Sequence, residues 1–178
     1  MPRLAGVTST DRFVNLVEER IDLAIRIGHL EESSLVARRI GEIRLVLCAS
    51  AEFLQQHGKP ELPAELTEWP CIIDSNNPDG VQWKLMAGQE ELNIEVNQHL
   101  TVNNARAARD LVMRGNGIGY LPSFVVQEQV RDGSLIELLQ DYSSATLGIY
   151  AMYLHRKHLS LKVRRLMELL THAFVDEF

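Results

Sequence analysis

Hydrophobic and polar residues alternate along several short stretches of the chain, and this spacing predicts β-strands. In Asp22–Gly28 every second residue is Leu or Ile, which gives a strand one apolar face. A helix is predicted directly before this strand, because apolar residues recur at helical spacing from Phe13 to Ile21, behind Thr10 and Asp11 as cap candidates. A helix that leads into a short apolar strand is typical of α/β folds.

The same patterns predict alternating strands and helices along the rest of the chain. Turns at Gly88 and Asn97 predict antiparallel strands within Gln82–Val102. The alternation as a whole predicts an α/β fold whose sheets are mainly parallel and flanked by helices. Further strands are expected at Leu35–Ile40, Ile43–Ala49, Cys71–Asp74, Gln82–Met86, Leu92–Val96, His99–Val102, Ile118–Leu121, Leu135–Leu138 and Leu147–Leu154, and helices at Ala51–His57, Pro63–Glu68, Asn104–Arg114, Ser123–Arg131 and Leu161–Asp176.

Charge and composition narrow the class of protein. The formal net charge of -6 argues against binding nucleic acid by charge alone, since phosphate contacts need a basic face. No apolar run approaches the roughly 20 residues of a membrane span, and Met1–Thr8 lacks the apolar core of a signal peptide. Cys48 and Cys71 lie in apolar strands, which favours buried free thiols over a disulfide. These features indicate a soluble, cytoplasmic protein.

The sequence contains no motif that predicts catalysis. It has neither a Gly-x-Ser-x-Gly elbow, nor a P-loop, nor a Gly-x-Gly-x-x-Gly run, so an enzyme is not expected. The glycine-rich segment Gly115–Gly119 is interpreted as a helix stop followed by a tight entry into a strand. His155 and His158 could share a metal, but a solvated basic loop is the favoured interpretation. We therefore expect no metal and no cofactor.

Binding of a small anion is better supported, because three predicted helices start directly after strands. Helix N-termini present unpaired N–H groups and a positive partial charge, so starts that share one cleft would cradle a carboxylate or another anion. Arg26, at the end of its strand, would add a fixed positive charge. Alternatively, the polar residues at the starts are ordinary caps, and Arg26 pairs with Asp22 or Glu19. The starts are at Ser50, at Asn103 and Asn104, and at Pro122 and Ser123.

An ordered set of segments resembles the effector domain of LysR-type transcriptional regulators. One of them is the run Gly115-Asn-Gly-Ile-Gly-Tyr-Leu-Pro122, and the matches extend in family order from about Pro2 onward. The matching segments are Asp11–Gly28, Ser34–Ile40, Arg44–Pro60, Gly115–Pro122, Ile149–Tyr153 and Leu159–Val163.

The resemblance implies a periplasmic-binding-protein-like fold, in which two α/β lobes enclose a cleft. Lobe I would comprise residues 1–49 and 147–178, and lobe II residues 50–146. A small, anionic effector would bind between the lobes at Arg26, Ser50, Asn103 and Pro122, and would shift the geometry of a homodimer or homotetramer. DNA would be contacted only by a winged helix-turn-helix domain that is absent from this chain.

The chain also departs from the family pattern at its start. Besides the winged helix-turn-helix and its linker helix, the first strand and helix of the effector domain should precede Pro2. We therefore expect a fragment whose lobe I is incomplete at its N-terminus. Two alternatives stay open: a solute-binding protein of similar fold, and a truncated regulator that acts by pairing with full-length partners.

Overall fold

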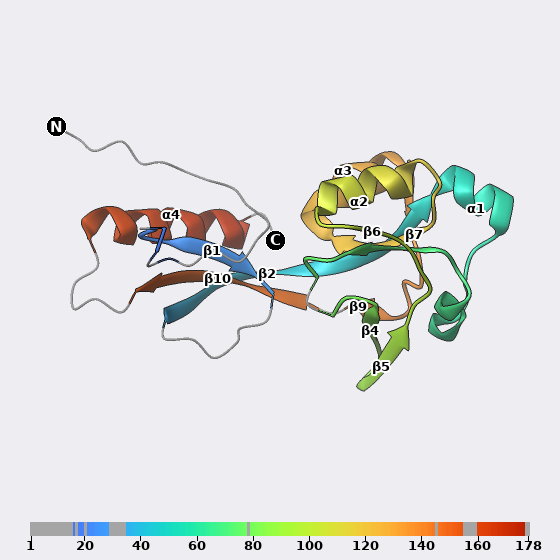
Figure 1. Ribbon diagram of the computed structural model, residues 1–178, viewed down its shortest axis with the longest axis horizontal. Helices are drawn as coiled ribbons and strands as arrows, with labels where there is room; N and C mark the ends of the chain where they lie inside the picture. Colours follow the sequence, from blue (N-terminus) through green and yellow to red (C-terminus); the bar gives the residue numbers. More distant parts are fainter. Residues whose placement is uncertain are drawn as a thin grey trace.

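The computed structural model describes residues 16, 18–19, 21–28, 35–77, 79–144, 146–154 and 160–176 (Figure 1). The helix predicted before Asp22 and the pair His155 and His158 fall largely or wholly outside these residues. In chain order the elements are β1 (Ala24–Ile27), β2 (Leu35–Ser50), α1 (Ala51–His57), the 3-10 helix η1 (Pro63–Thr67), β3 (Cys71–Asp74), β4 (Gln82–Ala87), β5 (Glu90–Glu95), β6 (Gln98–Val102), α2 (Ala105–Met113), β7 (Ile118–Pro122), α3 (Ser123–Asp132), β8 (Leu135–Glu137), β9 (Ser143–Ser144), β10 (Thr146–Leu154) and α4 (Leu161–Asp176).

The long strand β2 joins two groups of elements. From Leu35 to Arg44 it pairs antiparallel with β10, whose other edge carries β1. From Leu45 to Cys48 it pairs with β7, and from Cys48 to Ser50 with β8. Figure 1 shows the first group, with α4, at one end of β2 and the second group, with α1, α2 and α3, at the other. We call these groups the first and the second lobe.

Two strands predicted at Leu35–Ile40 and Ile43–Ala49 are therefore one continuous strand. Gly41 and Glu42 break the apolar pattern but not the strand. The register shifts here, because Gly41 lies opposite Ile149 while Arg39 lies opposite Tyr150, so that Ile40 is an extra residue in β2. Such a β-bulge bends a strand without ending it.

The expectation of mainly parallel sheets is wrong. Among the described strands, only β3–β6 and β3–β7 pair in parallel, whereas β1–β10, β10–β2, β2–β7, β2–β8, β4–β5 and β4–β9 are antiparallel. The reason is that β2 leaves the first lobe and β10 returns to it, so these neighbouring strands run in opposite directions. The sheet is mixed, with its parallel part confined to the second lobe.

The middle of the chain is only partly the antiparallel unit that its turns predict. β4 and β5 form a hairpin around Gly88, which has a φ of +65°. β6 does not continue the hairpin but enters the main sheet beside β3, in parallel. Trp83 and Leu85 of β4 are each 2% exposed, so the hairpin is anchored to the core by its inward face.

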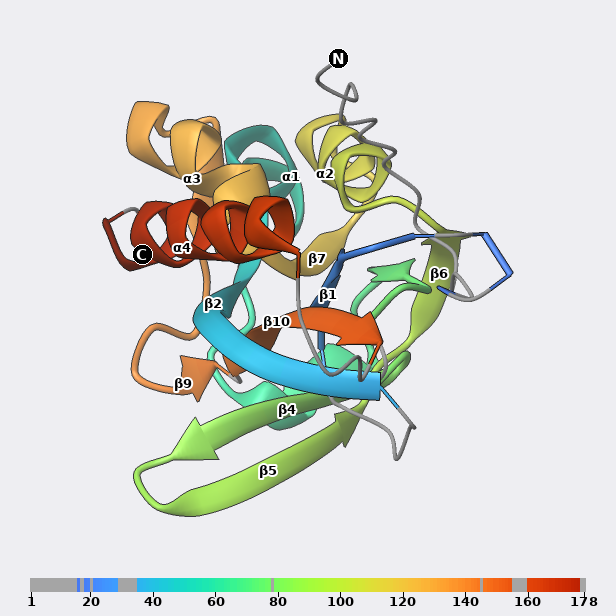
Figure 2. The same cartoon turned by 90° about the vertical axis from the view of Figure 1, so that its left-hand side faces the viewer.

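The helices pack on the sheet through their apolar faces. In the first lobe, Val163 and Met167 of α4 pack in one hydrophobic cluster with Ile40, Ile149 and Ala151. Figure 2 shows α4 lying over β2 and β10. In the second lobe, α2 and α3 bury a separate cluster on the opposite face of β2, which contains Val46, Cys48, Ala108, Val112, Val125 and Val126.

The glycine-rich segment ends α2 and admits a close backbone contact. The N–H of Gly115, which has a φ of +75°, donates to the carbonyl of Val112. Gly117 has a φ of +142°, and a Cβ added there would lie 2.2 Å from the carbonyl oxygen of Pro70. The interpretation as a helix stop and strand entry is confirmed.

Gly117→Ala is expected to lower the free energy of unfolding by about 3 kcal/mol, because backbone strain and a clash with rigid backbone act together. The matched control is Gly133→Ala, which has a φ of +80° but open space around the added Cβ. It should cost only about 1 kcal/mol. Urea denaturation of both variants measures the difference, and equal losses would show that the contact with Pro70 is not limiting.

Candidate functional site

The three parallel strands of the second lobe end at one edge of the sheet. Asp74 ends β3, Val102 ends β6 and Pro122 ends β7, and Leu45 of β2 lies opposite Pro122. Since β2 enters the second lobe at Leu45, this edge faces the first lobe (Figure 1). In α/β sheets, ligands bind beyond the carboxyl ends of such strands. We call it the inter-lobe edge.

Asn103 and Asn104 lie at the inter-lobe edge, after β6. The Asn104 side chain caps α2, accepting hydrogen bonds from the N–H groups of Arg106 at 3.1 Å and Ala107 at 3.0 Å. Asn103 has an exposed side chain, and its carbonyl accepts a 2.6 Å hydrogen bond from the Asn76 amide. That bond ties the loop after β6 to the loop after β3.

Asp74 adds a carboxylate to the same edge, and sequence reasoning did not identify it. It is 8% exposed, and it accepts a 3.0 Å hydrogen bond from the N–H of Asn76. The sequence does contain a signal for this residue, namely an acid directly after the apolar residues of a predicted buried strand. Buried carboxylates are rare unless paired, so such an acid is a candidate site residue. With Asn76 it shapes the turn beside Asn103.

Pro122 and Ser123 lie at the edge as predicted, at the start of α3. Pro122 occupies the cap position and provides no side-chain hydrogen bond there. β3 lies between β6 and β7, so the starts of α2 and α3 are two strand spacings apart, about 10 Å. The structure therefore brings Asn103, Asn104, Pro122 and Ser123 together.

Ser50 does not belong to this group. Because β2 runs antiparallel to β7, Ser50 lies at the opposite edge of the sheet, where it pairs with Leu135. Its side chain is buried and caps α1 by accepting from the N–H of Phe53 at 3.2 Å. The predicted cradle of three helix starts is thus wrong for Ser50, which is a structural cap.

Arg26 lies in the first lobe, half-buried in β1 opposite Tyr150. Tyr150 is four positions along β10 from Thr146, where β2 crosses between the lobes, a distance of about 13 Å along the strand. Arg26 is therefore on the other side of the crossing from Asn103. Its contact with a ligand stays a prediction.

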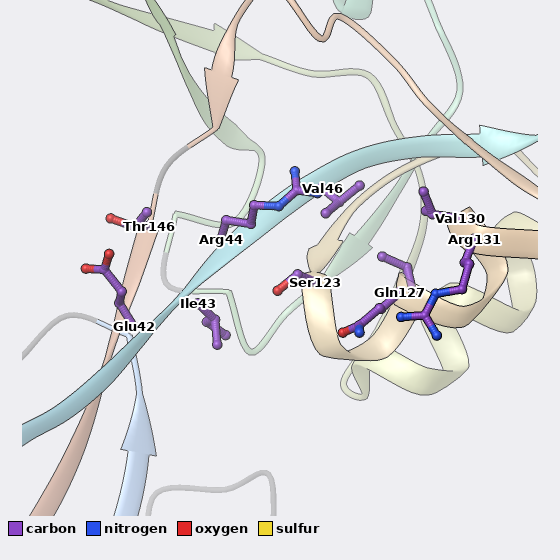
Figure 3. A pocket seen from close by; sticks show the side chains of 10 residues that line it. Glu42, Ile43, Arg44, Val46, Ser123, Gln127, Val130, Arg131 and Thr146 are labelled. Carbon is purple, nitrogen blue, oxygen red and sulfur yellow. The ribbon is translucent and has the colours of Figure 1, made fainter. Parts of the chain in front are cut away.

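A groove of about 510 Å³ begins at Ser123 and runs between α3 and β2 (Figure 3). Its cations, Arg44 and Arg131, were not identified from the sequence, since Arg44 stands within an apolar strand. Arg44 donates to Glu137 from Nη1 at 2.6 Å and from Nη2 at 3.4 Å. The hydrogen bond to Glu137 raises the pKa of Arg44 above its usual value, which keeps the guanidinium charged.

Metal binding has no support within the described residues, where no three His, Cys, Asp or Glu side chains gather. Cys48 and Cys71 are buried and free, as predicted. Burial raises the pKa of each thiol to about 12. Over the same part of the chain, every helix is too short or too polar to cross a bilayer.

Comparisons with known proteins agree on one family. The model of the LysR substrate binding domain matches residues 6–175. The regulator DmlR of Escherichia coli K12 is 33% identical over 170 residues, covering 94% of this chain and 55% of DmlR. An uncharacterized HTH-type transcriptional regulator of Haemophilus influenzae is 32% identical over 157 residues, or 88% of this chain and 54% of the relative. The chain thus spans about half the length of these curated relatives.

Solved structures of LysR-type regulators share the fold. The CrgA regulatory domain from Neisseria meningitidis is 29% identical with a TM-score of 0.80, covering 93% of this chain and 81% of that one. Full-length AphB, a virulence activator of Vibrio cholerae, is 28% identical with a TM-score of 0.78, covering 94% and 57%. The two-lobed, periplasmic-binding-protein-like fold predicted from the resemblance is confirmed. The lobe boundaries at residues 49/50 and 146/147 stay a prediction.

Asn104→Ala is expected to lower the free energy of unfolding by about 1 kcal/mol, because two N–H groups of α2 lose their cap. Asn104→Asp, which keeps the acceptor, should retain most of the stability. Asn103→Ala serves as the neighbouring control and should leave stability unchanged, as its side chain is exposed. A loss in the control equal to that of Asn104→Ala in chemical denaturation would contradict the capping role.

Neither thiol is expected to react with a disulfide reagent in the folded protein at pH 8, whereas both should react once the chain is unfolded. The folded pKa of about 12 lies above the unfolded value of 9.0, so folded thiols hold their protons more tightly. Their contribution to stability is complete below pH 9 and is lost as the pH rises toward 12. Thiol titration and denaturation curves across that range measure both effects.

Proposed function

We propose, because the chain belongs to the LysR substrate-binding domain family, that it is the effector-sensing and oligomerisation domain of a bacterial transcriptional regulator. The relatives are LysR-type regulators, a family of non-enzymes. The DNA contact would be made by a winged helix-turn-helix domain outside these 178 residues. The regulator would act in the cytoplasm, where the promoter that it controls is located.

The effector would be a small anion bound at the inter-lobe edge. One observation carries this assignment: the N-termini of α2 and α3 start side by side at the edge that faces the first lobe. Their first N–H groups and positive partial charge favour a carboxylate or a similar group. Asn103, Asn104, Pro122 and Ser123 would contact it from the second lobe, and Arg26 from the first.

Binding would act by shifting populations of two lobe arrangements. β2 and β10 pass between the lobes, so the lobes can change their mutual angle only if these strands bend. An effector that contacts both sides of the crossing binds one arrangement better and enriches it. In a homodimer or homotetramer, that change would alter how attached DNA-binding domains grip a promoter.

A thermal-shift screen of small carboxylates, aromatic acids and amino acids tests the proposal. A true effector should stabilise the chain by about 2.7 kcal/mol at 100 times its dissociation constant. Arg26→Ala and Asn103→Ala should each weaken that stabilisation. Asn93→Ala, an exposed asparagine on the distant hairpin, is the matched control and should not. Stabilisation that survives both changes would refute the site.

A further inference from the structure

The groove between α3 and β2 has two regular walls. On β2, Glu42, Arg44 and Val46 are two residues apart and face the same side of the sheet. On α3, Ser123, Gln127 and Arg131 are four residues apart and form one polar row. All of these residues line the groove (Figure 3), whose walls are each about 12 Å long.

The floor of the groove is apolar and fixed in place. Val46 is 2% exposed and Val126 is fully buried, and both belong to the second hydrophobic cluster. Val130 continues the apolar row along α3 and is partly buried against the same cluster. Packing against this core gives the floor one conformation, which is typical of a preformed binding surface.

The charges in the groove are distributed unevenly. Figure 3 shows the Arg44 side chain extending along β2 toward Val46, in the direction in which α3 runs from Ser123 to Arg131. Figure 3 shows the Arg131 side chain on the far side of Gln127 from Arg44, so the two guanidinium groups lie at separate points along the groove. Glu42, the acid that lines the groove, is paired with Arg39. Within the described part of the chain, no ion pair of Arg131 is found, whereas Arg44 is held by Glu137.

We propose that this groove, which adjoins the inter-lobe edge at Ser123, is a second ligand site for a small amphipathic monocarboxylate. The carboxylate is bound by the Arg131 guanidinium, whose donor geometry matches two oxygens. The apolar part of the ligand lies on the partly buried Val130, above the buried Val46 and Val126. The volume of about 510 Å³ is in the range of small-molecule sites.

Glu137 acts in this site as an internal competitor. Its carboxylate makes with Arg44 the bidentate contact that a ligand carboxylate would make. Arg44 is half exposed, so a ligand in the groove can reach its guanidinium, but only in place of Glu137. The ligand therefore gains the contact of a second cation only by releasing Glu137.

The position of the groove connects it to the crossing between the lobes. Thr146, the first residue of β10, also lines it and lies opposite Arg44. A bound ligand would touch α3 and both crossing strands at the point where the partner of β2 changes from β10 to β7. It would thereby fix the second lobe relative to the crossing, independently of any effector at the inter-lobe edge.

NMR titration of the ¹⁵N-labelled 178-residue chain with cyclohexanecarboxylate tests the proposal, with the neutral cyclohexanecarboxamide as a control of equal shape. Saturable shifts are expected with the acid at the amides of Arg44, Val46, Val126 and Arg131, and none with the amide compound. Shifts confined to Asn103 and its neighbours would assign the acid to the inter-lobe edge and overturn the second site. Absence of saturable shifts at millimolar acid would also overturn it, while leaving the effector screen unaffected.

Variants then distinguish the contribution of Arg131 from that of Arg44. Arg131→Met is expected to weaken binding of the acid about tenfold, as one charge-assisted contact is lost. Glu137→Gln should tighten it several-fold, because Arg44 is no longer held by a carboxylate. Arg165→Met removes an exposed arginine on α4 and should leave the affinity unchanged. Unchanged affinity in Arg131→Met would overturn the site, and unchanged affinity in Glu137→Gln would overturn the competition for Arg44.

Discussion

The continuous hydrogen bonding of β2 is the constraint on which the rest of the structure depends. Sixteen residues of one strand exchange partners once, from β10 to β7 and β8, and each lobe forms its sheet on one half. A break in the strand would remove the edge on which both sheets are built. The direction of β2 also fixes which end of the second sheet faces the first lobe, and hence which loops can meet a ligand between them.

Local patterns predicted most elements because each element buries one side. α4 has its apolar residues at helical spacing, and β3 is buried throughout because it lies in the middle of its sheet, between β6 and β7. The sequence contains no comparable pattern for the pairing between strands that are distant along the chain. Nothing in Leu35–Ile40 and Ile43–Ala49 shows that Gly41 and Glu42 continue the strand, and nothing in Gln98–Val102 shows that β6 joins β3 rather than β5. The α/β class could be predicted, but not the mixed strand directions.

The same limit applies to the sites. Each helix start was visible from its cap residue and preceding strand, but which starts share an edge depends on strand direction. Ser50 follows a strand that runs opposite to β7, so it was grouped with Pro122 although the sheet separates them. Arg44 and Glu137 are 93 residues apart in sequence, and only the pairing of β8 with β2 brings them into contact. Functional groups that depend on sheet order need the structure.

The extra residue at Ile40 changes which face of β2 the side chains after it occupy. Side chains of a regular strand alternate between faces, so residues an odd number apart point to opposite sides. Ile40 and Ile43 are three apart, yet both are buried in the cluster that also contains Leu45, Leu47 and Ala49. At the bulge, which lies between the two lobes, the alternation of side chains between the faces of β2 shifts by one residue. Each half of β2 can therefore keep its own inward set of side chains, and a one-residue change in length near Gly41 need not turn the core of the other lobe outward.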